Sequence, residues 1–493
     1  MIAFAQLFRC AGVKPAAISG DATIESLVAD SRVAGSGALF VCMPSANTDS
    51  HQFLAPAQMK GAVAALAHTE AGFQAAVAAG MAAAWVPAGS FQDALWRIVR
   101  AFHGSPTRGL RLVGVTGTNG KTTTAWIVRD ALNALGRSCA YLGTLGLTTP
   151  AGARTLENTT PFSVELNDLI LEVVRGGADT LAMEVSSHAL EERRADGLEF
   201  DVATFTNLTQ DHLDYHGSME AYAASKRRLF FDLPTQTTKP FRAAINTDDP
   251  VGARWASSLD SCVSYGFASG DLRGAGLEVR VDGLSLGLDY RGQTAMLQTR
   301  LAGHFNLSNC LAAAATLAAL GYTLEECVHG LAQATPVPGR FESIPNDRGV
   351  GVIVDYAHTP DALEKLLDSA RRLTEGRLIA VFGCGGDRDR KKRPLMARAV
   401  SERADVSVLT SDNPRTEDPQ QILADVRAGL VPGAESLEIV DRPEAIARAV
   451  GMARAGDVVV IAGKGHEDYQ ILGRTKHPMD DRKLAREALG GGS

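Results

Sequence analysis

The sequence predicts an α/β protein with three domains. Its 493 residues are too many for one ordinary hydrophobic core, and a chain of this length is expected to form about three domains. Short apolar runs alternate with helical patterns over much of the chain, which is typical of mostly parallel sheets. Two segments rich in glycine and proline, 104–109 and 336–339, interrupt this alternation. We therefore expect domains at 1–105, 106–337 and 338–493.

The composition is that of a globular protein and gives no reason to expect nucleic acid as a partner. Hydrophobic residues make up 45% of the chain, charged residues 21%, and the formal net charge is -7. The most apolar stretches, 75–86 and 310–320, are too short to span a bilayer, and no signal peptide is evident. The seven scattered cysteines favour free thiols. We expect a cytoplasmic, monomeric protein that is not membrane-embedded.

The first domain is expected to be a small α/β unit. A strand pattern at 37–42 is followed by a stretch rich in alanine and glycine, and a helical pattern covers 91–103.

The second domain begins with a predicted phosphate-binding loop. The apolar run 112–115 leads into Gly117-Thr-Asn-Gly-Lys-Thr-Thr123 and then into a helical pattern. The glycines let the backbone approach an anion, Lys121 offers a positive charge to phosphate, and Thr122 offers a hydroxyl to Mg²⁺. The spacing departs from the standard P-loop, because Val115 stands where that motif has its first glycine. We predict that this variant loop binds the phosphates of a nucleotide.

Two polar clusters follow strand patterns in the same domain. Buried strands are expected at 139–142, 180–185, 202–207 and 242–246, alternating strands between 277 and 301, and helices at 307–320 and 324–334. Glu184 and His212 stand at the ends of two of these strands. Together with the Thr122 hydroxyl they form a candidate Mg²⁺ site beside the phosphates.

The third domain carries four strand patterns, each followed by a polar cluster. The strands are expected at 352–354, 378–382, 406–409 and 458–461. Ligands of open α/β sheets bind beyond the carboxyl ends of the strands, so the four clusters predict one shared site. The clusters are Asp355-Tyr-Ala-His358, Gly383-Cys-Gly-Gly-Asp-Arg-Asp389, Asp412-Asn-Pro-Arg415 and Ala462-Gly-Lys-Gly-His-Glu467.

Taken together, the motifs resemble those of the Mur ligase family, ATP-dependent amide-forming enzymes of cell-wall peptide synthesis. The similarity covers nearly the whole chain and is closest to the members that add meso-2,6-diaminopimelate. It implies a small N-terminal uridine-binding α/β domain, a central P-loop-type ATPase domain with a mostly parallel sheet, and a C-terminal Rossmann-like α/β domain. The residues that carry it are Gly117–Thr123, Asn158-Thr-Thr160, Glu184-Val-Ser-Ser-His188, Asp211-His-Leu-Asp-Tyr-His216, Pro338-Gly-Arg-Phe341, Asp355–His358, Asp412–Arg415 and Gly463–Glu467.

The resemblance also implies a reaction and its co-substrates. ATP would transfer its γ-phosphoryl group to the D-glutamyl carboxylate of UDP-N-acetylmuramoyl-L-alanyl-D-glutamate, and the amine of diaminopimelate would attack the resulting acyl phosphate. Both steps develop charge on oxygen atoms, so Lys121 and Mg²⁺ would act by electrostatic stabilisation and positioning. The catalytic residues implied are Lys121, Glu184, His212 and Lys226.

Lys226 has two opposed interpretations. Its pattern, on a helix after the His-rich loop, favours a solvent-facing lysine. The resemblance instead implies a carbamylated lysine, whose carboxylate-like oxygen would bind metal with Thr122, Glu184 and His212.

The resemblance implies binding residues for ATP and for the nucleotide sugar. Those for ATP are Gly117, Thr118, Asn119, Gly120, Lys121, Thr122, Thr123, Asn306, Asn309, Arg340, Asp355 and His358. Those for the nucleotide-sugar dipeptide are Ser31, Ala46, Asn47, Thr48, Asn158, Thr159, Thr160, Ser186, Glu192 and Arg194. Glu192 departs from the family, which commonly has glutamine there, and a carboxylate would repel an anionic substrate.

The choice of amino acid depends on an arginine-bearing turn. Diaminopimelate carries a distal carboxylate that lysine lacks, and the Arg415 guanidinium can bind a carboxylate with two hydrogen bonds. The implied diaminopimelate set is Arg388, Asp412, Asn413, Pro414, Arg415, Gly463 and Glu467. Taken alone, the motif also fits a plain Asx-Pro turn. An L-lysine-adding ligase, a folylpolyglutamate-synthase-like ligase and a non-catalytic nucleotide-binding regulator remain as alternatives.

Overall fold

The computed structural model describes residues 1–44 and 48–490. Contacts divide the chain into two compact units, Met1–Lys121 with Gly136–Val263, and Thr122–Leu135 with Ser264–Ser493. The N-terminal and C-terminal parts each have a sheet of their own, and a long, mostly parallel sheet belongs to the central part. The α/β class and the three-domain organisation are therefore confirmed, whereas the exact domain boundaries stay predictions. Within the described ranges, no helix is both long and apolar enough to cross a membrane.

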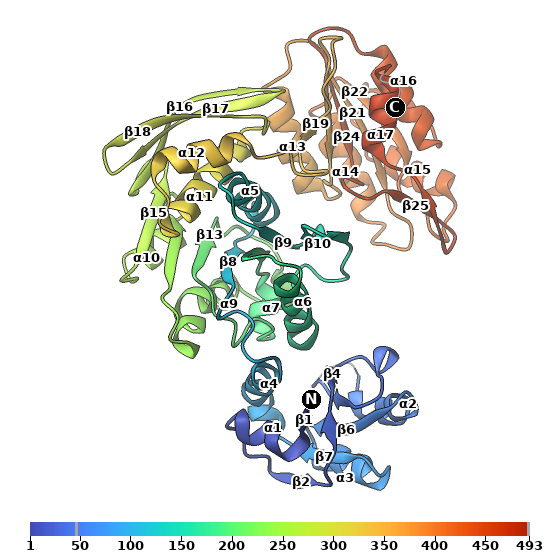
Figure 1. The fold of residues 1–493 in the computed structure, drawn as a ribbon. Coiled ribbons are helices and arrows are strands. Elements are labelled where there is room, and N and C mark those ends of the chain that lie inside the picture. The colour runs from blue at the N-terminus through green and yellow to red at the C-terminus, as the bar shows by residue number, and fades with distance from the viewer. Residues whose placement is uncertain (45–47, 491–493) are drawn as a thin grey trace. The chain divides into compact units, whose positions relative to one another are not determined.

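The N-terminal sheet is covered by helices on both faces (Figure 1). Its order is β2-β7-β6-β5-β4, in which β2 runs antiparallel to β7 and the other pairs are parallel. The predicted strand at 37–42 is β5, but the alanine-rich strands β6 and β7 were missed, because alanine is a weak strand former. The elements are β1 (Ile2–Ala3), α1 (Phe4–Cys10), β2 (Ala17–Ser19), β3 (Thr23–Ile24), β4 (Ser26–Val28), β5 (Ala38–Val41), α2 (Leu54–Met59), β6 (Ala62–Ala67), α3 (Glu70–Ala78), β7 (Ala82–Trp85) and α4 (Ala88–His103).

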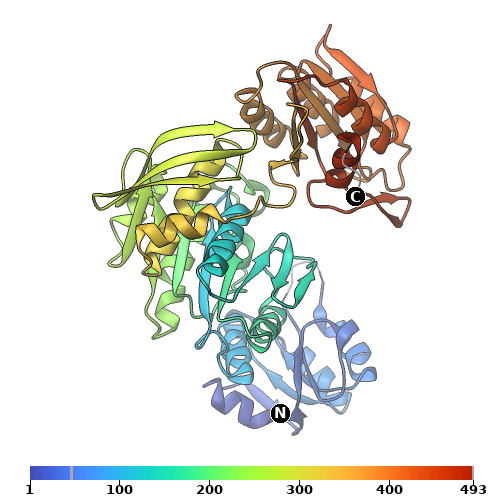
Figure 2. The same ribbon diagram turned by 45° about the horizontal axis from the view of Figure 1, so that its top comes forward.

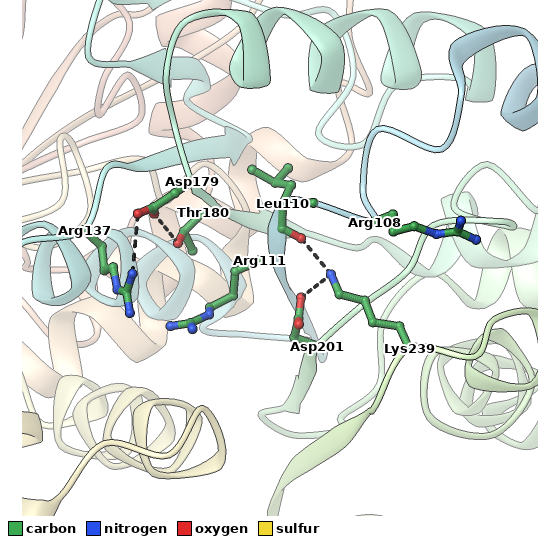
Figure 3. A pocket seen from close by; sticks show the side chains of 9 residues that line it. Arg108, Leu110, Arg111, Arg137, Asp179, Thr180, Asp201 and Lys239 are labelled. Carbon is green, nitrogen blue, oxygen red and sulfur yellow. Dashed lines mark hydrogen bonds and ion pairs between the residues drawn. The ribbon is translucent and has the colours of Figure 1, made fainter.

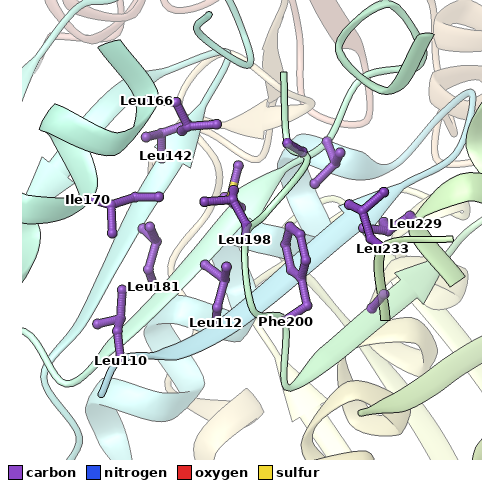
Figure 4. Packing of buried hydrophobic residues seen from close by; sticks show 14 of the residues in the cluster. Leu110, Leu112, Leu142, Leu166, Ile170, Leu181, Leu198, Phe200, Leu229 and Leu233 are labelled. Atoms are coloured by element: carbon purple, nitrogen blue, oxygen red, sulfur yellow. The ribbon is translucent and has the colours of Figure 1, made fainter. Parts of the chain in front are cut away.

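In the first unit, the central sheet has the order β11-β10-β9-β12-β8-β13-β14, and its five strands from β9 to β14 run parallel. Leu112, Leu142 and Leu181 of three of these strands pack against Leu166 and Ile170 of α6 (Figure 4). This core holds the carboxyl ends of the strands, where the predicted site residues lie. The elements are β8 (Arg111–Thr116), β9 (Cys139–Gly143), β10 (Gly146–Thr149), β11 (Gly152–Arg154), α6 (Ser163–Arg175), β12 (Thr180–Glu184), α7 (Ser187–Glu191), β13 (Val202–Phe205), α8 (Leu213–His216), α9 (Met219–Phe231), β14 (Arg242–Asn246) and α10 (Pro250–Ala256).

The second unit contains an antiparallel meander, which Figure 2 shows as long paired arrows. Turns at Asp282-Gly and Arg291-Gly join β16 to β17 and β17 to β18, within the predicted region of alternating strands. The helix α12 begins with a capping box formed by Thr323 and Glu326. The elements are α5 (Lys121–Ala134), β15 (Cys262–Gly266), β16 (Leu272–Arg280), β17 (Gly283–Tyr290), β18 (Gln293–Thr299), α11 (Phe305–Ala319) and α12 (Leu324–Ala332).

The C-terminal sheet has the order β19-β20-β24-β21-β22-β23, and all of its strands except β19 are parallel. Alternate strand residues face two hydrophobic clusters, one with α13 to α15 and one with α16 and α17. The four predicted strands are β20, β21, β22 and β24, so the four polar clusters follow the same edge of one sheet. The elements are β19 (Glu342–Ser343), β20 (Gly351–Asp355), α13 (Pro360–Arg371), β21 (Leu378–Cys384), α14 (Lys392–Ser401), β22 (Val406–Ser411), α15 (Pro419–Arg427), β23 (Glu435–Glu438), α16 (Arg442–Met452), β24 (Val458–Ala462), β25 (Tyr469–Leu472), β26 (Thr475–Pro478) and α17 (Asp481–Ala488).

Candidate active site

The predicted phosphate loop links the end of β8 to the start of α5. Gly117 and Gly120 have φ angles of 150° and 85°, which L side chains rarely adopt, and a Cβ at Gly117 would collide with the Thr206 hydroxyl. The Lys121 Nζ donates to the carbonyl oxygens of Gly117, at 3.0 Å, and Thr118, at 2.8 Å. The lysine is thus folded over its own loop, where a phosphate ligand would meet its charge.

Side chains at the end of β13 support this loop. The Asn119 backbone N–H donates to Asn207 Oδ1 at 3.0 Å, and Thr206 Oγ1 donates to the Asn119 carbonyl at 2.6 Å. Thr118 Oγ1 lies 3.2 Å from the Tyr222 hydroxyl of α9. The loop conformation is therefore tied to two neighbouring elements of the same unit.

Lys226 is buried, which contradicts the solvent-facing position that its sequence pattern favours. Its side chain is 1% exposed, because α9 turns this face toward the loop, and its Nζ donates to the Gly117 carbonyl at 2.9 Å. The ammonium group also lies 4.6 Å from the centre of the Tyr222 ring. Burial, followed by repulsion from Lys121, holds the Lys226 pKa well below its ordinary value. A neutral amine at this place is the chemical form that can react with CO₂.

Glu184 ends β12 and is buried beside hydrogen-bond donors. Its Oε1 accepts from the Tyr141 hydroxyl at 2.5 Å and from the Thr144 N–H at 2.8 Å. These donors orient the carboxylate. The Glu184 carbonyl accepts from Thr160 Oγ1 at 2.9 Å. The structure therefore brings the predicted substrate residue Thr160 to the same strand end as the predicted metal ligand.

His212 lies in a cluster of aromatic rings after β13. It has a left-handed φ of 51°, and its ring centre lies 4.8 Å from that of His188. Its Nε2 lies 3.4 Å from Asp211 Oδ2. Burial, followed by repulsion from His212 and His216, lowers the pKa of His188. The lowered pKa of His188 favours its neutral ring.

The predicted nucleotide-sugar residues include a charged pair that accounts for Glu192. Arg194 Nη2 lies 2.7 Å from Glu192 Oε2, and Arg194 Nη1 donates to the Thr160 carbonyl at 2.8 Å. The arginine therefore neutralises the carboxylate that stands in the place of glutamine. Ser186 accepts from the Ala189 N–H and caps α7. Thr159 lies 3.2 Å from the Thr144 hydroxyl, and Asn158 is half-buried nearby in the chain.

In the N-terminal domain, Ser31 begins a short 3-10 helix, Ser31–Val33, which Asp30 caps. Thr48 is exposed, whereas Ala46 and Asn47 lie outside the described residues.

Two of the residues predicted for ATP are buried at the start of α11. Asn306 Nδ2 donates to the Ala302 carbonyl at 2.6 Å, and Asn309 Nδ2 donates to Asn306 Oδ1 at 2.8 Å. The two amides are therefore linked to each other and to the backbone before any ligand binds.

Arg340, Asp355 and His358 gather around Tyr356. The Arg340 guanidinium lies 5.0 Å from the centre of the Tyr356 ring, and His358 Nδ1 lies 2.8 Å from the Tyr356 carbonyl. Asp355 accepts the N–H groups of Phe341 and Ala357, and burial raises its pKa. His466 is part of this cluster, 5.2 Å from the Tyr356 ring, and burial lowers its pKa to about 4. The sequence motif contained His466, but its role was missed.

The loops after β21, β22 and β24 bring together most of the predicted amino-acid site. Arg415 has a left-handed φ of 52° and donates from Nη1 to the Gly386 carbonyl at 2.8 Å. A Cβ at Gly385 would lie 3.0 Å from Arg415 Nη1 and 3.6 Å from Arg388 Cγ, so both arginines flank this loop. A Cβ at Gly463 would lie 2.7 Å from Asp412 Oδ2, which explains the glycine there.

The hairpin β25–β26, which sequence reasoning missed, supports the Asp412–Arg415 turn. Arg415 N–H donates to the Ile471 carbonyl at 3.1 Å, and Gly473 N–H donates to the Arg415 carbonyl at 2.8 Å. Gln470 Nε2 donates to the Asp412 carbonyl at 2.7 Å. Pro414 lies between these contacts, so the turn is more than a solvated loop.

A separate cavity of about 270 Å³ lies at the amino-terminal ends of the central strands (Figure 3). It is lined by residues at the starts of β8, β12 and β13 rather than at their carboxyl ends. Its cations already have partners, since Lys239 Nζ lies 2.7 Å from Asp201 and Arg137 lies 3.7 Å from Asp179. This cavity is therefore distinct from the phosphate loop.

Comparison with known proteins identifies the family. Residues 115–317 match the Mur ligase middle domain, and residues 339–465 match the Mur ligase glutamate ligase domain. The chain is 44% identical to UDP-N-acetylmuramoyl-L-alanyl-D-glutamate--2,6-diaminopimelate ligase of Geobacter sulfurreducens, over 97% of each chain. The chain belongs to the Mur ligase family.

Solved structures agree with this assignment. A solved structure described as UDP-N-acetylmuramoyl-L-alanyl-D-glutamate--2,6-diaminopimelate ligase is 34% identical, with a TM-score of 0.68 and 95% of each chain covered. MurF ligase of Thermotoga maritima, solved in complex with ADP, shares the fold with a TM-score of 0.60 at 19% identity, over 95% of this chain and 97% of that one.

Proposed function

We propose that this Mur ligase uses ATP to join meso-2,6-diaminopimelate to the D-glutamate of UDP-N-acetylmuramoyl-L-alanyl-D-glutamate, in peptidoglycan precursor synthesis. The relatives that share 44% of its residues carry the name of this activity. The observation that carries the proposal in the structure is the Asp412–Arg415 turn, in which the hairpin β25–β26 holds the arginine. A guanidinium so placed suits a ligand with a distal carboxylate, such as diaminopimelate.

The residues of the first unit support the phosphoryl-transfer step. The D-glutamyl carboxylate oxygen attacks the γ-phosphorus, ADP leaves, and an acyl phosphate forms. Lys121, folded over the Gly117–Thr123 loop, stabilises the charge on the transferred phosphoryl oxygens. The amine of diaminopimelate then attacks the acyl carbon, phosphate leaves, and the amine proton is lost to solvent.

The oxygen-rich donor set fits Mg²⁺. Thr122, Glu184, His212 and a carbamate on Lys226 would hold the ion, and the buried, oriented Glu184 carboxylate and the low pKa of Lys226 support that assignment. When bound, the ion would neutralise phosphate charge. We further propose that the enzyme acts as a cytoplasmic monomer with the domain boundaries 1–105, 106–337 and 338–493.

The test is the dependence of ATP turnover on the other substrates. Phosphate release by the purified chain should require both the nucleotide-sugar dipeptide and diaminopimelate, and L-lysine should replace diaminopimelate poorly. Equal rates with lysine would favour the lysine-adding alternative. Turnover with a folate substrate would favour a folylpolyglutamate-synthase-like enzyme, and ATP binding without turnover would favour a regulator.

A further inference from the structure

Lys464 lies buried between two residues of the predicted amino-acid site. It follows β24 in the Gly463–Glu467 segment, and its side chain is 0% exposed. Its Nζ donates to Asn413 Oδ1 and to Glu467 Oε2, both at 3.1 Å. Asn413 Nδ2 also donates to Glu467 Oε2 at 3.1 Å. The three side chains form a closed ring of hydrogen bonds.

This ring determines which way the Asn413 amide faces. Its Oδ1 accepts from Lys464 Nζ and also from the Ile471 N–H, at 2.9 Å. A flipped amide would place its NH₂ group against two donors, so both contacts select one orientation. The Nδ2 group then has one hydrogen on Glu467 and a second that can donate to a carboxylate.

The charge of Lys464 has a second effect on the same site. A buried ammonium group needs a compensating partner, and Glu467 supplies the carboxylate. The pairing is mutual, because the lysine also offsets the negative charge of Glu467. Without Lys464, that carboxylate would repel the distal carboxylate of a ligand held by Arg415.

We propose that Lys464 is a positioning residue for diaminopimelate. It orients the Asn413 amide and neutralises part of the Glu467 charge. The ammonium group of the distal head then meets an acceptor, and its carboxylate group meets a donor. The proposal rests on the proposed function. Lys464 acts through Asn413 and Glu467 and is not assigned a contact with the reacting atoms.

The test compares Lys464→Met, Asn413→Ala and the double variant with the full-length enzyme. We expect Lys464→Met to raise the KM for diaminopimelate roughly tenfold to hundredfold, as loss of a charged hydrogen-bond partner does. The KM for ATP and the kcat at saturating diaminopimelate should stay within about twofold, because the Lys464 amine donates to Asn413 and Glu467 of the predicted amino-acid site. Because Lys464 acts partly through Asn413, the loss in the double variant should be smaller than the product of the two single losses.

The matched control is Lys365→Met, which removes an exposed lysine of α13 that pairs with Asp361. It should leave every constant unchanged. An unchanged diaminopimelate KM in Lys464→Met, or effects that multiply in the double variant, would overturn the inference. If Lys464→Met does not fold, Lys464→Gln, which also removes the charge, replaces it: a raised diaminopimelate KM supports the proposal and a wild-type KM refutes it. Wild-type turnover that ignores diaminopimelate would instead refute the proposed function.

Discussion

Replacing Lys226 with methionine should raise the stability of the protein and lower its activity. The lysine is 1% exposed, and its amine lies 2.9 Å from the Gly117 carbonyl on the phosphate loop. Methionine has nearly the same shape without the amine. We expect the variant to fold, to bind no CO₂ and to lose activity by a factor of about 100 or more, as expected when a group that stabilises transition-state charge is removed.

The direction of the pKa shift gives the sign of the stability change. Burial, then repulsion from Lys121, lowers the folded-state pKa of Lys226 below its ordinary value of 10.5. Between the two pKa values the unfolded chain binds more protons, so stability falls as the pH falls through this window. At neutral pH and without CO₂, the buried amine therefore costs stability. Lys226→Met should stabilise the protein by about 1–3 kcal/mol in thermal unfolding.

The same shift explains why CO₂ should react at this lysine. An ordinary lysine is neutral in only about one molecule in a thousand at pH 7.4, and each unit of lowered pKa raises that fraction about tenfold. Carbon-13 NMR with labelled bicarbonate should show one protein carbamate signal that disappears in Lys226→Met. The control Lys365→Met removes an exposed lysine paired with Asp361 and should keep the signal. No signal in the wild type, with full activity in Lys226→Met, would refute the reasoning.

Three further changes test other parts of the site. Arg415→Ala should raise the KM for diaminopimelate about 100-fold, because a bidentate pair is lost, and should leave the KM for ATP unchanged. The control is Arg474→Ala, which removes an exposed arginine. An unchanged KM for diaminopimelate in Arg415→Ala would exclude the role of Arg415. Glu192→Gln should free Arg194 and lower the KM for the nucleotide-sugar dipeptide about threefold, the scale of a partly exposed ion pair; a raised KM would contradict this. Gly117→Ala should abolish ATP binding in calorimetry, because its side chain would collide with a neighbouring hydroxyl.

The strands and the loops after them could be predicted because their signals are local. Short, mostly apolar runs, such as Val-Ser-Val-Leu at 406–409 and Val-Val-Val-Ile at 458–461, indicate buried parallel strands, and their carboxyl ends share one edge. The structure confirms them as β22 and β24. The alanine-rich strands β6 and β7 carry no such signal. Their side chains fit a sheet covered on both faces, which is a tertiary reason that a local pattern does not contain.

The candidate site was predictable in its residue types but less so in its contacts. The family resemblance implied Asn413 and Glu467, yet the role of Lys464 depends on pairing between segments about fifty residues apart. The hairpin β25–β26 was also missed. It holds Arg415 through a contact between segments that are far apart in the sequence. Lys226 is the opposite case. Its local pattern favours solvent, and only the packing of α9 against the phosphate loop makes it buried.

Three buried cations differ in how fully the protein compensates them, and the difference follows their roles. Arg442 pairs with Asp481 at 2.7 Å and also donates to the Ala462 carbonyl at 3.0 Å, so its charge is matched within the protein and its role is structural. Lys464 and the Asn413 amide both donate to the Glu467 carboxylate, and this arrangement still leaves donors and acceptors for a ligand. Lys226 has a carbonyl oxygen and an aromatic ring, which stabilise an ammonium group much less than a carboxylate does. Burying an amine that the fold compensates so weakly costs stability, and the chemistry proposed for Lys226 converts that amine into a metal-binding carboxylate.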